Sequence, residues 1–251
     1  MTVGIFLAGL IQKGVSVNVL TSAFYGIRWA HSVIGVTSPT ESELVKNVLE
    51  AGKRKLSVPK TKKEPISAEL LLKMYDKFFQ YENVYNQRSI CTCLIAYAGF
   101  LRCSELLNIR CSDVVFQKSH ISSFIEKSKT DIYRDGQWVV IARTNSRLCP
   151  VKNLEMFFRW CGFTEGFTDF IFCNLSKTKN GHKVRNGDKA LTYTRMRELF
   201  IEVFRGFVPD ISKYGLHSLR AGGATVCANS GISVRLFKKH GRWKSESAKD
   251  G

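Results

Sequence analysis

A histidine and an arginine stand three residues apart in the segment Leu216 to Thr225, which has the character of a helix start. Side chains at this spacing point the same way on a helix, and a helix N-terminus adds partial positive charge. His217 and Arg220 together would therefore suit one phosphate group. The spacing alone is equally typical of a capped helix with a solvated arginine, because His-x-x-Arg is a common pattern.

Three other segments place donors or cations in unusual settings. Arg102 lies in an apolar turn, where a buried charge needs a partner that Glu105 could supply. Lys129, with Lys127 close by, precedes an expected hairpin turn and could reach outward to a ligand. Trp243 stands among cations, and its indole nitrogen only donates hydrogen bonds. Taken singly, each also fits an ion pair, a solvated lysine or a packed tryptophan, so their order along the chain carries the signal.

The charge balance favours a polyanionic partner. The chain of 251 residues has 38 Lys and Arg against 21 Asp and Glu, a formal net charge of +17. Such a surplus indicates nucleic acid first and an acidic membrane surface second. The sequence has no apolar run of membrane-spanning length, no signal peptide, no Lys-rich amphipathic helix and no aromatic RNA-binding motif. We therefore expect DNA as the partner and no membrane.

The cysteine pattern does not favour disulfides or zinc. Eight cysteines occur without a Cys-x-x-Cys pair, which is not the spacing of zinc ligands. Most of them lie in apolar segments, where a reduced cysteine packs as a small hydrophobic side chain. We expect a reducing compartment, no metal and no cofactor.

Hydrophobic periodicity predicts a mostly α-helical chain with one small antiparallel sheet, an α+β fold. Residues 121–141 change to β-branched and aromatic runs around Arg134-Asp135-Gly136-Gln137, a hairpin turn signal. Residues 177–187 are polar and basic and are expected to form a loop. The expected helices cover residues 1–11, 17–34, 38–52, 67–79, 90–98, 150–161 and 192–207.

A basic, proline-broken stretch over residues 53–63 has no period and is typical of a linker. We therefore expect a small helical unit over residues 1–56 and a larger unit over residues 57–251. The stretch is either a solvated tether or a strap that follows DNA. The side chains predicted to contact DNA are Lys53, Arg54, Lys60, Lys62, Lys239, Arg242 and Lys244.

The order of these segments resembles the tyrosine recombinases, the phage integrase superfamily. The family pattern is a G-x-R-x-S-E-L segment, a hairpin S-K-T lysine, H-x-L-R and a G-[HW] turn. It is matched here by Gly99 to Leu106, Ser128-Lys129-Thr130, His217-Ser218-Leu219-Arg220 and Gly241-Arg242-Trp243, with Phe100 and Arg242 as extra residues. The resemblance spans roughly residues 15 to 251. The sequences of residues 219–225 and 241–247 are most similar to those of recombinases from eukaryotic mobile elements, of the DIRS and Crypton kind.

The resemblance implies a tyrosine-recombinase catalytic domain over residues 57–251, preceded by a partial helical core-binding domain, the two gripping duplex DNA as a clamp. It implies DNA recombination or integration at a scissile phosphate without a metal. Arg102 and Arg220 would hold the non-bridging oxygens, and bidentate guanidinium contacts strengthen as charge develops there. His217 and Trp243 would donate hydrogen bonds to the same phosphate.

The remaining implied roles concern the leaving group and the first arginine. Lys129 would protonate the departing 5′ oxygen as general acid, with Lys127 as the rival candidate. Glu105 would orient Arg102 rather than touch DNA. The implied partners are double-stranded DNA and, in the intact protein, further copies of the chain in a tetrameric synapse. The location would be the nucleus in a eukaryote and otherwise the cytoplasm, with DNA.

The family's nucleophilic tyrosine would fall at position 252, nine residues after Trp243, whereas the sequence ends at Gly251. We therefore expect these residues to bind a DNA phosphate without forming a covalent phosphotyrosine link, as a fragment or as an inactive product. Whether the chain is an enzyme stays open at this point. The first unit also looks short, with two or three helices where the family usually has about four.

A non-enzymatic alternative is a helix-turn-helix DNA-binding module. Residues 218–229 and 233–239 could form two helices about a turn at Gly231. Both hypotheses predict salt-sensitive DNA binding, so only chemistry separates them.

Overall fold

The computed structural model describes residues 2–59, 61–129, 131, 133–164 and 166–243. It divides into two compact units, Met1–Thr61 and Lys62–Gly251. The first unit therefore extends a few residues beyond the predicted end at Leu56.

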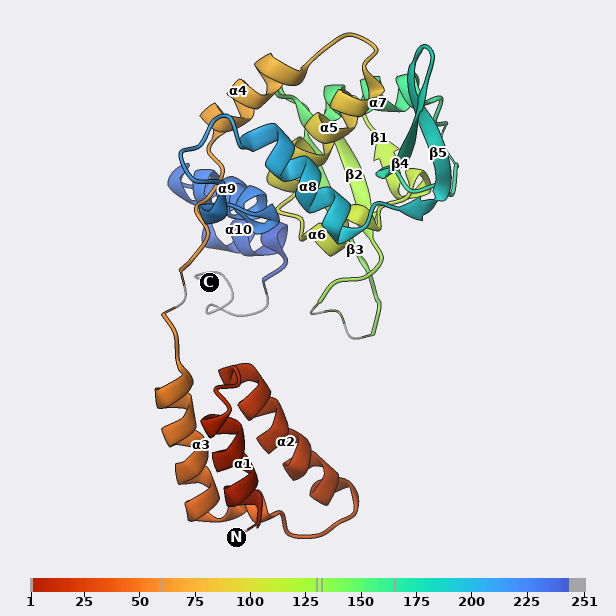
Figure 1. The fold of residues 1–251 in the computed structure, drawn as a ribbon. Helices are drawn as coiled ribbons and strands as arrows, with labels where there is room; N and C mark the ends of the chain where they lie inside the picture. The colour runs from red at the N-terminus through yellow and green to blue at the C-terminus, as the bar shows by residue number, and fades with distance from the viewer. Residues whose placement is uncertain (1, 60, 130, 132, 165, 244–251) are drawn as a thin grey trace. The chain divides into compact units, whose positions relative to one another are not determined.

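Three helices, α1 (Thr2–Gln12), α2 (Val17–Val33) and α3 (Glu43–Leu56), form the first unit (Figure 1). The Ser16 hydroxyl caps α2 by accepting a hydrogen bond from the Val19 amide at 3.3 Å. A 3-10 turn, η1 (Pro39–Glu41), precedes α3. The small core between the helices consists of Leu7, Leu20, Phe24, Val45 and Leu49.

Gly52 lies inside α3 and does not end the helix, so the predicted boundary is wrong. A Cβ at Gly52 would collide with the side chains of Ile11 and Leu20. The glycine is thus explained by the close approach of α1 and α2, and the helix continues to Leu56. The first residues of the predicted linker are therefore helical.

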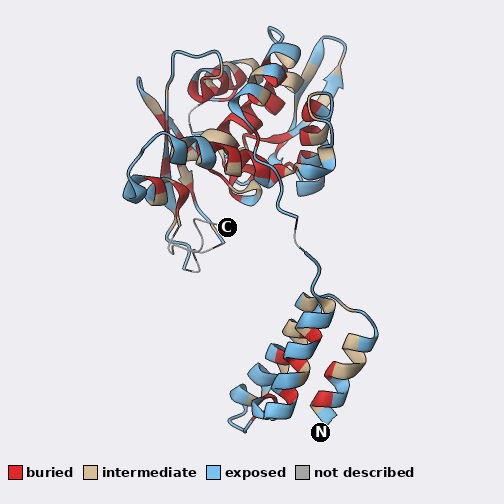
Figure 2. Ribbon diagram, turned by 90° about the vertical axis from the view of Figure 1, so that its left-hand side faces the viewer, coloured by how far each residue is buried: buried red, intermediate tan, exposed pale blue. Residues whose placement is uncertain are grey.

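Helix α5 (Val84–Ala98) is the central helix of the second unit and packs against α6 and four longer helices. All residues from Gln87 to Ala96 are buried, which is typical of a helix enclosed by its neighbours (Figure 2). The surrounding helices are α4 (Ala68–Phe78), α7 (Pro150–Cys161), α8 (Tyr193–Phe204) and α9 (Leu216–Asn229). The unit also contains α6 (Cys103–Leu107), α10 (Val234–Gly241), η2 (Cys111–Asp113) and η3 (Ile211–Lys213).

The first sheet has the antiparallel order β1 (Val114–Phe116), β2 (His120–Ile125), β3 (Gln137–Ala142). Ile121 pairs with Ile141 on the core side, and the outward Trp138 lies 5.2 Å from the Phe124 ring. Residues 126–136 join β2 to β3. This connection is longer than the two-residue Asp-Gly turn that the sequence predicted.

A second sheet replaces the basic loop predicted over residues 177–187. β4 (Cys173–Thr178) and β5 (Gly181–Ala190) form an antiparallel hairpin, with the turn at Lys179 and Asn180. Leu175 pairs with Val184, and both side chains pack on the core, whereas the lysines of the hairpin face outward. One apolar pair among many charges gives a weak strand signal, which accounts for the wrong prediction.

The cysteines are free thiols. Burial raises the pKa of Cys93 to about 12 and that of Cys103 to about 11, so both stay protonated at neutral pH. Within the described ranges, no three His, Cys, Asp or Glu side chains gather as a metal site. No described helix has the length and apolar character needed to cross a membrane.

Candidate functional site

His217 and Arg220 lie in the first two turns of α9. The Ser218 hydroxyl accepts a hydrogen bond from the Gly215 amide at 3.0 Å and so closes the first turn. The Ser218 carbonyl accepts another from the Ile66 amide at 2.9 Å, which ties the start of α9 to the segment before α4. His217 is exposed, whereas the Arg220 side chain is only 3% exposed.

Two glycines let α9 approach its neighbours at main-chain distance. A Cβ at Gly222 would collide with the Ile66 carbonyl oxygen. A Cβ at Gly223 would collide with the Tyr97 carbonyl oxygen and crowd the Phe100 ring. The Gly-Gly pair therefore brings Arg220 to the turn between α5 and α6.

The Arg220 guanidinium is held between that turn and the end of α10. Nη1 donates a short hydrogen bond to the Phe100 carbonyl, and Nη2 donates to the Gly241 carbonyl at 2.7 Å. Its Cζ lies 4.9 Å from the centroid of the Trp243 ring, a cation–π contact. Arg220 and Trp243 thus come together as the sequence predicted.

Arg102 and Glu105 form the predicted ion pair at the start of α6. The Arg102 amide donates to Glu105 Oε2 at 2.8 Å, and Arg102 Nη1 lies 2.7 Å from Oε1. The Glu105 side chain is 0% exposed, whereas that of Arg102 is 22% exposed. Arg102 therefore still reaches solvent while its carboxylate partner is enclosed.

Arg242 is buried, so the prediction that it contacts DNA is corrected. Its side chain is 3% exposed, and Nη2 lies 2.8 Å from Glu105 Oε2. Nη2 also donates to the Phe100 carbonyl at 3.0 Å, and Nη1 donates to the Gly99 carbonyl at 3.2 Å. A sequence shows that arginine has cationic neighbours along the chain, but it does not show the carboxylate that faces it from 137 residues away.

We call Arg102, Glu105, Arg220 and Arg242 the arginine cluster. Burial alone would raise the pKa of Glu105, but Arg242, followed by Arg102, holds that pKa below its usual value. Burial, together with Arg102 and Arg242, lowers the pKa of Arg220 to about 10. At neutral pH three guanidinium cations thus surround one carboxylate, which leaves a surplus of positive charge.

His217 adds a neutral donor beside this charge. Although much of the residue surface of His217 is exposed, surrounding protein removes water from the imidazole, and this desolvation, followed by repulsion from Arg220 and Arg102, lowers the pKa of His217 below 6.5. The imidazole is therefore uncharged at neutral pH, and it lies close enough to both arginines for their positive charge to affect its protonation. Arg102, His217, Arg220 and Trp243 accordingly meet in one place.

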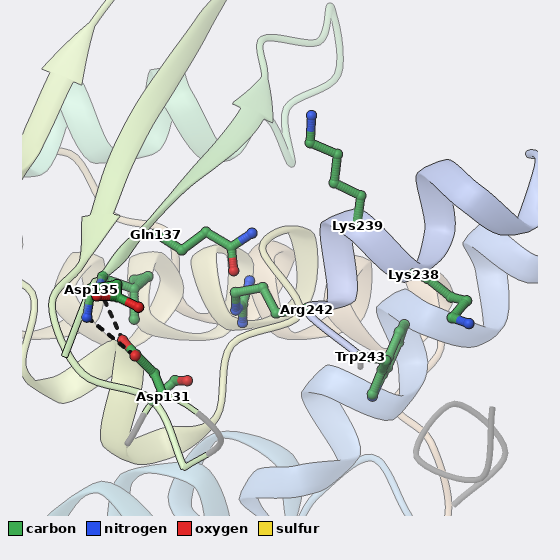
Figure 3. A pocket seen from close by; sticks show the side chains of 10 residues that line it. Asp131, Asp135, Gln137, Lys238, Lys239, Arg242 and Trp243 are labelled. Atoms are coloured by element: carbon green, nitrogen blue, oxygen red, sulfur yellow. Dashed lines mark hydrogen bonds between the residues drawn. The ribbon is translucent and has the colours of Figure 1, made fainter. Parts of the chain in front are cut away.

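A cavity of about 300 Å³ adjoins Trp243 and Arg242 (Figure 3). Lys239 of α10 lines it, as do Asp131 and Gln137 from the opposite side. The Asp131 carboxylate accepts hydrogen bonds from the amides of Gly136 at 2.9 Å and Asp135 at 3.2 Å. This carboxylate shapes the end of the β2–β3 connection next to the cavity.

We call residues 126–136 the lysine connection. Lys127 and Lys129 are both exposed on it, and their neighbour Ser128 lines the cavity beside Trp243. The connection therefore lies next to the arginine cluster, but its geometry does not choose between the two lysines. Thr130 of the S-K-T match lies outside the described residues.

Sequence comparison gives one curated relative of interest, and no family model matches the chain. Over 214 residues the chain is 25% identical to an integrase/recombinase XerD homologue of Selenomonas ruminantium. This alignment covers 84% of the chain and 60% of the relative, so the chain spans less than two thirds of that protein.

Solved recombinases share the fold. The XerH site-specific recombinase in its pre-cleavage complex with difH aligns with a TM-score of 0.60 at 16% identity, covering 98% of this chain and 65% of XerH. A λ integrase dimer bound to a COC′ core site also gives 0.60 at 16% identity, covering 99% of this chain and 77% of the integrase. The chain is thus similar in sequence to one integrase/recombinase and shares the fold of solved tyrosine recombinases. The predicted fold class, mostly helical with small antiparallel sheets, is confirmed.

The other predicted DNA contacts are distributed over both units. Lys53 pairs with Glu50 at 2.6 Å on α3, and Arg54 and Lys62 are exposed. Lys239 lines the cavity beside the arginine cluster. Two further predicted contacts, Lys60 and Lys244, lie outside the described residues.

Phe100 belongs to the site although the sequence reasoning assigned it no role. Its φ of 47° lies in the left-handed region, as does the φ of 56° at Arg242, and such a residue costs about 1–2 kcal/mol. The Phe100 carbonyl accepts hydrogen bonds from Arg220 and Arg242, and its ring lies 4.6 Å from His240. Phe100 and Arg242 are the two extra residues of the family pattern, which was the available signal.

Proposed function

We propose that this protein binds double-stranded DNA and acts in site-specific recombination or integration by phosphoryl transfer at a scissile phosphate. The observation that carries the proposal is the meeting of Arg102, His217, Arg220 and Trp243, from three separate segments, beside one buried carboxylate. Donors that are already in place need no reorganisation when charge develops in the transition state. The DNA complexes of XerH and λ integrase support the proposal.

In the proposed reaction, Arg102 and Arg220 bind the non-bridging oxygens of the phosphate. Arg220 directs two of its N–H groups to the Phe100 and Gly241 carbonyls, and these fix the orientation of its guanidinium plane. His217 and Trp243 donate hydrogen bonds to the same phosphate. A buried guanidinium strengthens its contact with an anion because less water competes.

The leaving group takes its proton from the lysine connection. A tyrosine phenol loses its proton to water as its oxygen attacks the phosphorus, a 3′-phosphotyrosine bond forms, and the bond to the 5′ oxygen breaks. Lys129 gives a proton to that 5′ oxygen, with Lys127 as the rival. Glu105 orients Arg102 through the ion pair of 2.7 Å.

The proposal extends to organisation and origin. The three helices of the first unit act as a partial core-binding domain, and copies of the intact protein assemble as a tetramer on DNA. The dimer and complex forms of the neighbours support such an assembly. The sequence around Arg220 and Trp243 supports an evolutionary relationship to recombinases of DIRS and Crypton elements. In a eukaryotic host the protein would act in the nucleus, and otherwise in the cytoplasm.

Duplex binding is the first test. We expect the dissociation constant for a random-sequence duplex to rise steeply with salt, because the protein displaces counterions from several phosphates. Fluorescence anisotropy measured at salt concentrations between about 50 and 200 mM gives the slope of affinity against salt. Affinity that is weak and independent of salt would overturn the proposal.

Chemistry is the second test. A chain lengthened to carry tyrosine at position 252 should form a covalent adduct with some members of a library of nicked duplexes. The same chain with phenylalanine at that position should form none. If the tyrosine variant binds DNA but traps no adduct, a helix-turn-helix module built on α9 and α10 becomes the better hypothesis.

A further inference from the structure

We propose that Arg242 is a positioning residue, which fastens the end of α10, and with it Trp243, to the turn that carries Arg102. The inference rests on the proposed phosphate site and concerns how that site is held together. Figure 3 shows Arg242 and Trp243 leaving the end of α10 in different directions, one toward Gln137 and the other away from it.

The backbone at Arg242 is suited to glycine. The residue is the C-cap of α10, with φ 56° and ψ 37° in the left-handed region. Glycine is the usual residue at this position, and the family pattern has glycine directly before the His or Trp. An arginine here is therefore explained by its side chain, which must offset the unfavourable backbone.

That side chain connects two elements that are distant in sequence. Its two terminal nitrogens contact Glu105 Oε2 at 2.8 Å and the carbonyls of Phe100 at 3.0 Å, Gly99 at 3.2 Å and His240 at 3.1 Å. The first three partners belong to the α5–α6 turn and to α6, and the last belongs to α10. One planar guanidinium thus bridges both halves of the phosphate site.

Trp243 follows directly, and its ring is fixed by neighbours on the same two elements. It lies 4.8 Å from the Phe237 ring and covers Gly241 so closely that a Cβ there would collide with it. The Phe100 ring lies 6.1 Å away. The left-handed turn at Arg242 sets the direction in which Trp243 leaves α10, so a change at Arg242 should move the indole.

Charge gives Arg242 a second effect on the site. Glu105 Oε2 lies 2.8 Å from Arg242 but 3.9 Å from Arg220. With Arg242 present, the carboxylate is neutralised by a residue that is itself enclosed, and the charge of Arg220 remains available to phosphate. Without Arg242, Glu105 would draw Arg220 away from the carbonyls of Phe100 and Gly241.

The test uses the protein labelled with 5-fluorotryptophan, whose Trp243 fluorine signal is assigned from a Trp243→Phe variant. We compare Arg242→Gly, which suits the backbone, with Arg242→Met, which fills similar space without charge. Glu82→Gly is the matched control, because Glu82 also has a left-handed φ, of 58°, is exposed, and lies in the turn before α5, outside the proposed site. Duplex affinity is measured in parallel.

We expect both Arg242 variants to shift the Trp243 signal clearly and to weaken duplex binding slightly, with Arg242→Lys recovering part of each. Glu82→Gly should leave the Trp243 signal in place. An unmoved Trp243 signal and wild-type affinity in Arg242→Met would overturn the inference, even if Arg242→Gly fails to fold. A wild-type protein that does not bind duplex DNA would instead overturn the proposed function, and the fluorine shift would still decide the role of Arg242.

Discussion

The arginine cluster and the lysine connection lie side by side but are built in opposite ways. In the cluster, Glu105 is fully enclosed and the Arg220 side chain is 3% exposed, each with hydrogen-bond partners from distant segments. On the connection, Lys127 and Lys129 are exposed. The half of the site that would stabilise charge on the phosphate is therefore set before DNA arrives. We expect the half that would supply the proton to be placed only when DNA binds.

The largest effect should come from Arg220. In the chain with tyrosine at position 252, we expect Arg220→Lys to lower the rate of adduct formation by about 10³-fold. A lysine ammonium cannot donate the two parallel hydrogen bonds of a fixed guanidinium. Duplex affinity should fall only slightly, since one phosphate contact among many is lost. Adduct formation is followed on denaturing gels. Exposed Arg205 on the far end of α8 provides the control, as Arg205→Lys. Complete loss of DNA binding in Arg220→Lys would contradict the assignment.

A substitution at Glu105 tests how strongly the arginine cluster contributes to the stability of the protein. Glu105→Gln removes the carboxylate that faces Arg102 and Arg242, and it leaves enclosed cations without a counterion. We expect the free energy of unfolding to fall by about 3 kcal/mol, measured by urea denaturation. Glu69 pairs with Lys73 on the surface of α4, and Glu69→Gln should leave stability nearly unchanged. Equal effects of the two substitutions would mean that the cluster is not held by Glu105.

Substitutions of the lysines on the lysine connection should change the rate of adduct formation and hardly change the stability of the protein. We expect Lys129→Ala to slow adduct formation by about 10²-fold through loss of the general acid, and Lys127→Ala to have a small effect. A substrate with sulfur in place of the 5′ oxygen leaves without a proton and should restore the rate of the Lys129 variant. If that substrate rescues only Lys127→Ala, the acid is Lys127. Rescue of neither variant would exclude a lysine acid on this connection.

The smallest effect concerns the pH dependence of binding. Burial and the two arginines depress the pKa of His217 in the free protein, and a bound phosphate should raise it. A proton is then taken up on binding, so duplex affinity should increase a few-fold as the pH falls below about 6.5. Anisotropy at constant ionic strength measures this trend, which His217→Asn should flatten. The same trend in that variant would assign the proton elsewhere.

Stability should show the opposite trend with pH. A histidine whose pKa is lower in the folded state contributes fully above its unfolded value of 6.5 and loses that contribution as the pH falls. His240, whose pKa is lowered mainly by burial, acts in the same direction. Thermal unfolding between about pH 8 and 5 checks the sign.

Sequence reasoning succeeded where a local signal and the tertiary structure agree. Helix α7 runs over Pro150–Cys161 as predicted, since proline starts it and Gly162, with φ 72°, ends it. The Arg102–Glu105 ion pair was also anticipated, because a charge in an apolar turn needs a partner nearby. The helix pair around Gly231 is present as α9 and α10.

It failed where a residue owes its type to a distant neighbour. Gly52 looked like a helix end because nothing local shows that Ile11 and Leu20 occupy the place of its Cβ. Arg242 looked like a surface cation because its partner, Glu105, is remote in sequence. Both errors concern contacts between residues far apart in sequence, which the hydrophobic periodicity of the chain does not reveal.

The adjacent glycines of α9 limit how this protein can vary. Two glycines inside a helix cost roughly 2 kcal/mol relative to alanine, and they are present because main-chain oxygens of Ile66 and Tyr97 occupy the space of their missing side chains. A backbone oxygen cannot be trimmed by a compensating substitution, as a bulky side chain could. A deep mutational scan selected for DNA cleavage should therefore show Gly222 and Gly223 as consecutive positions at which even alanine is rejected, whatever the rest of the core becomes.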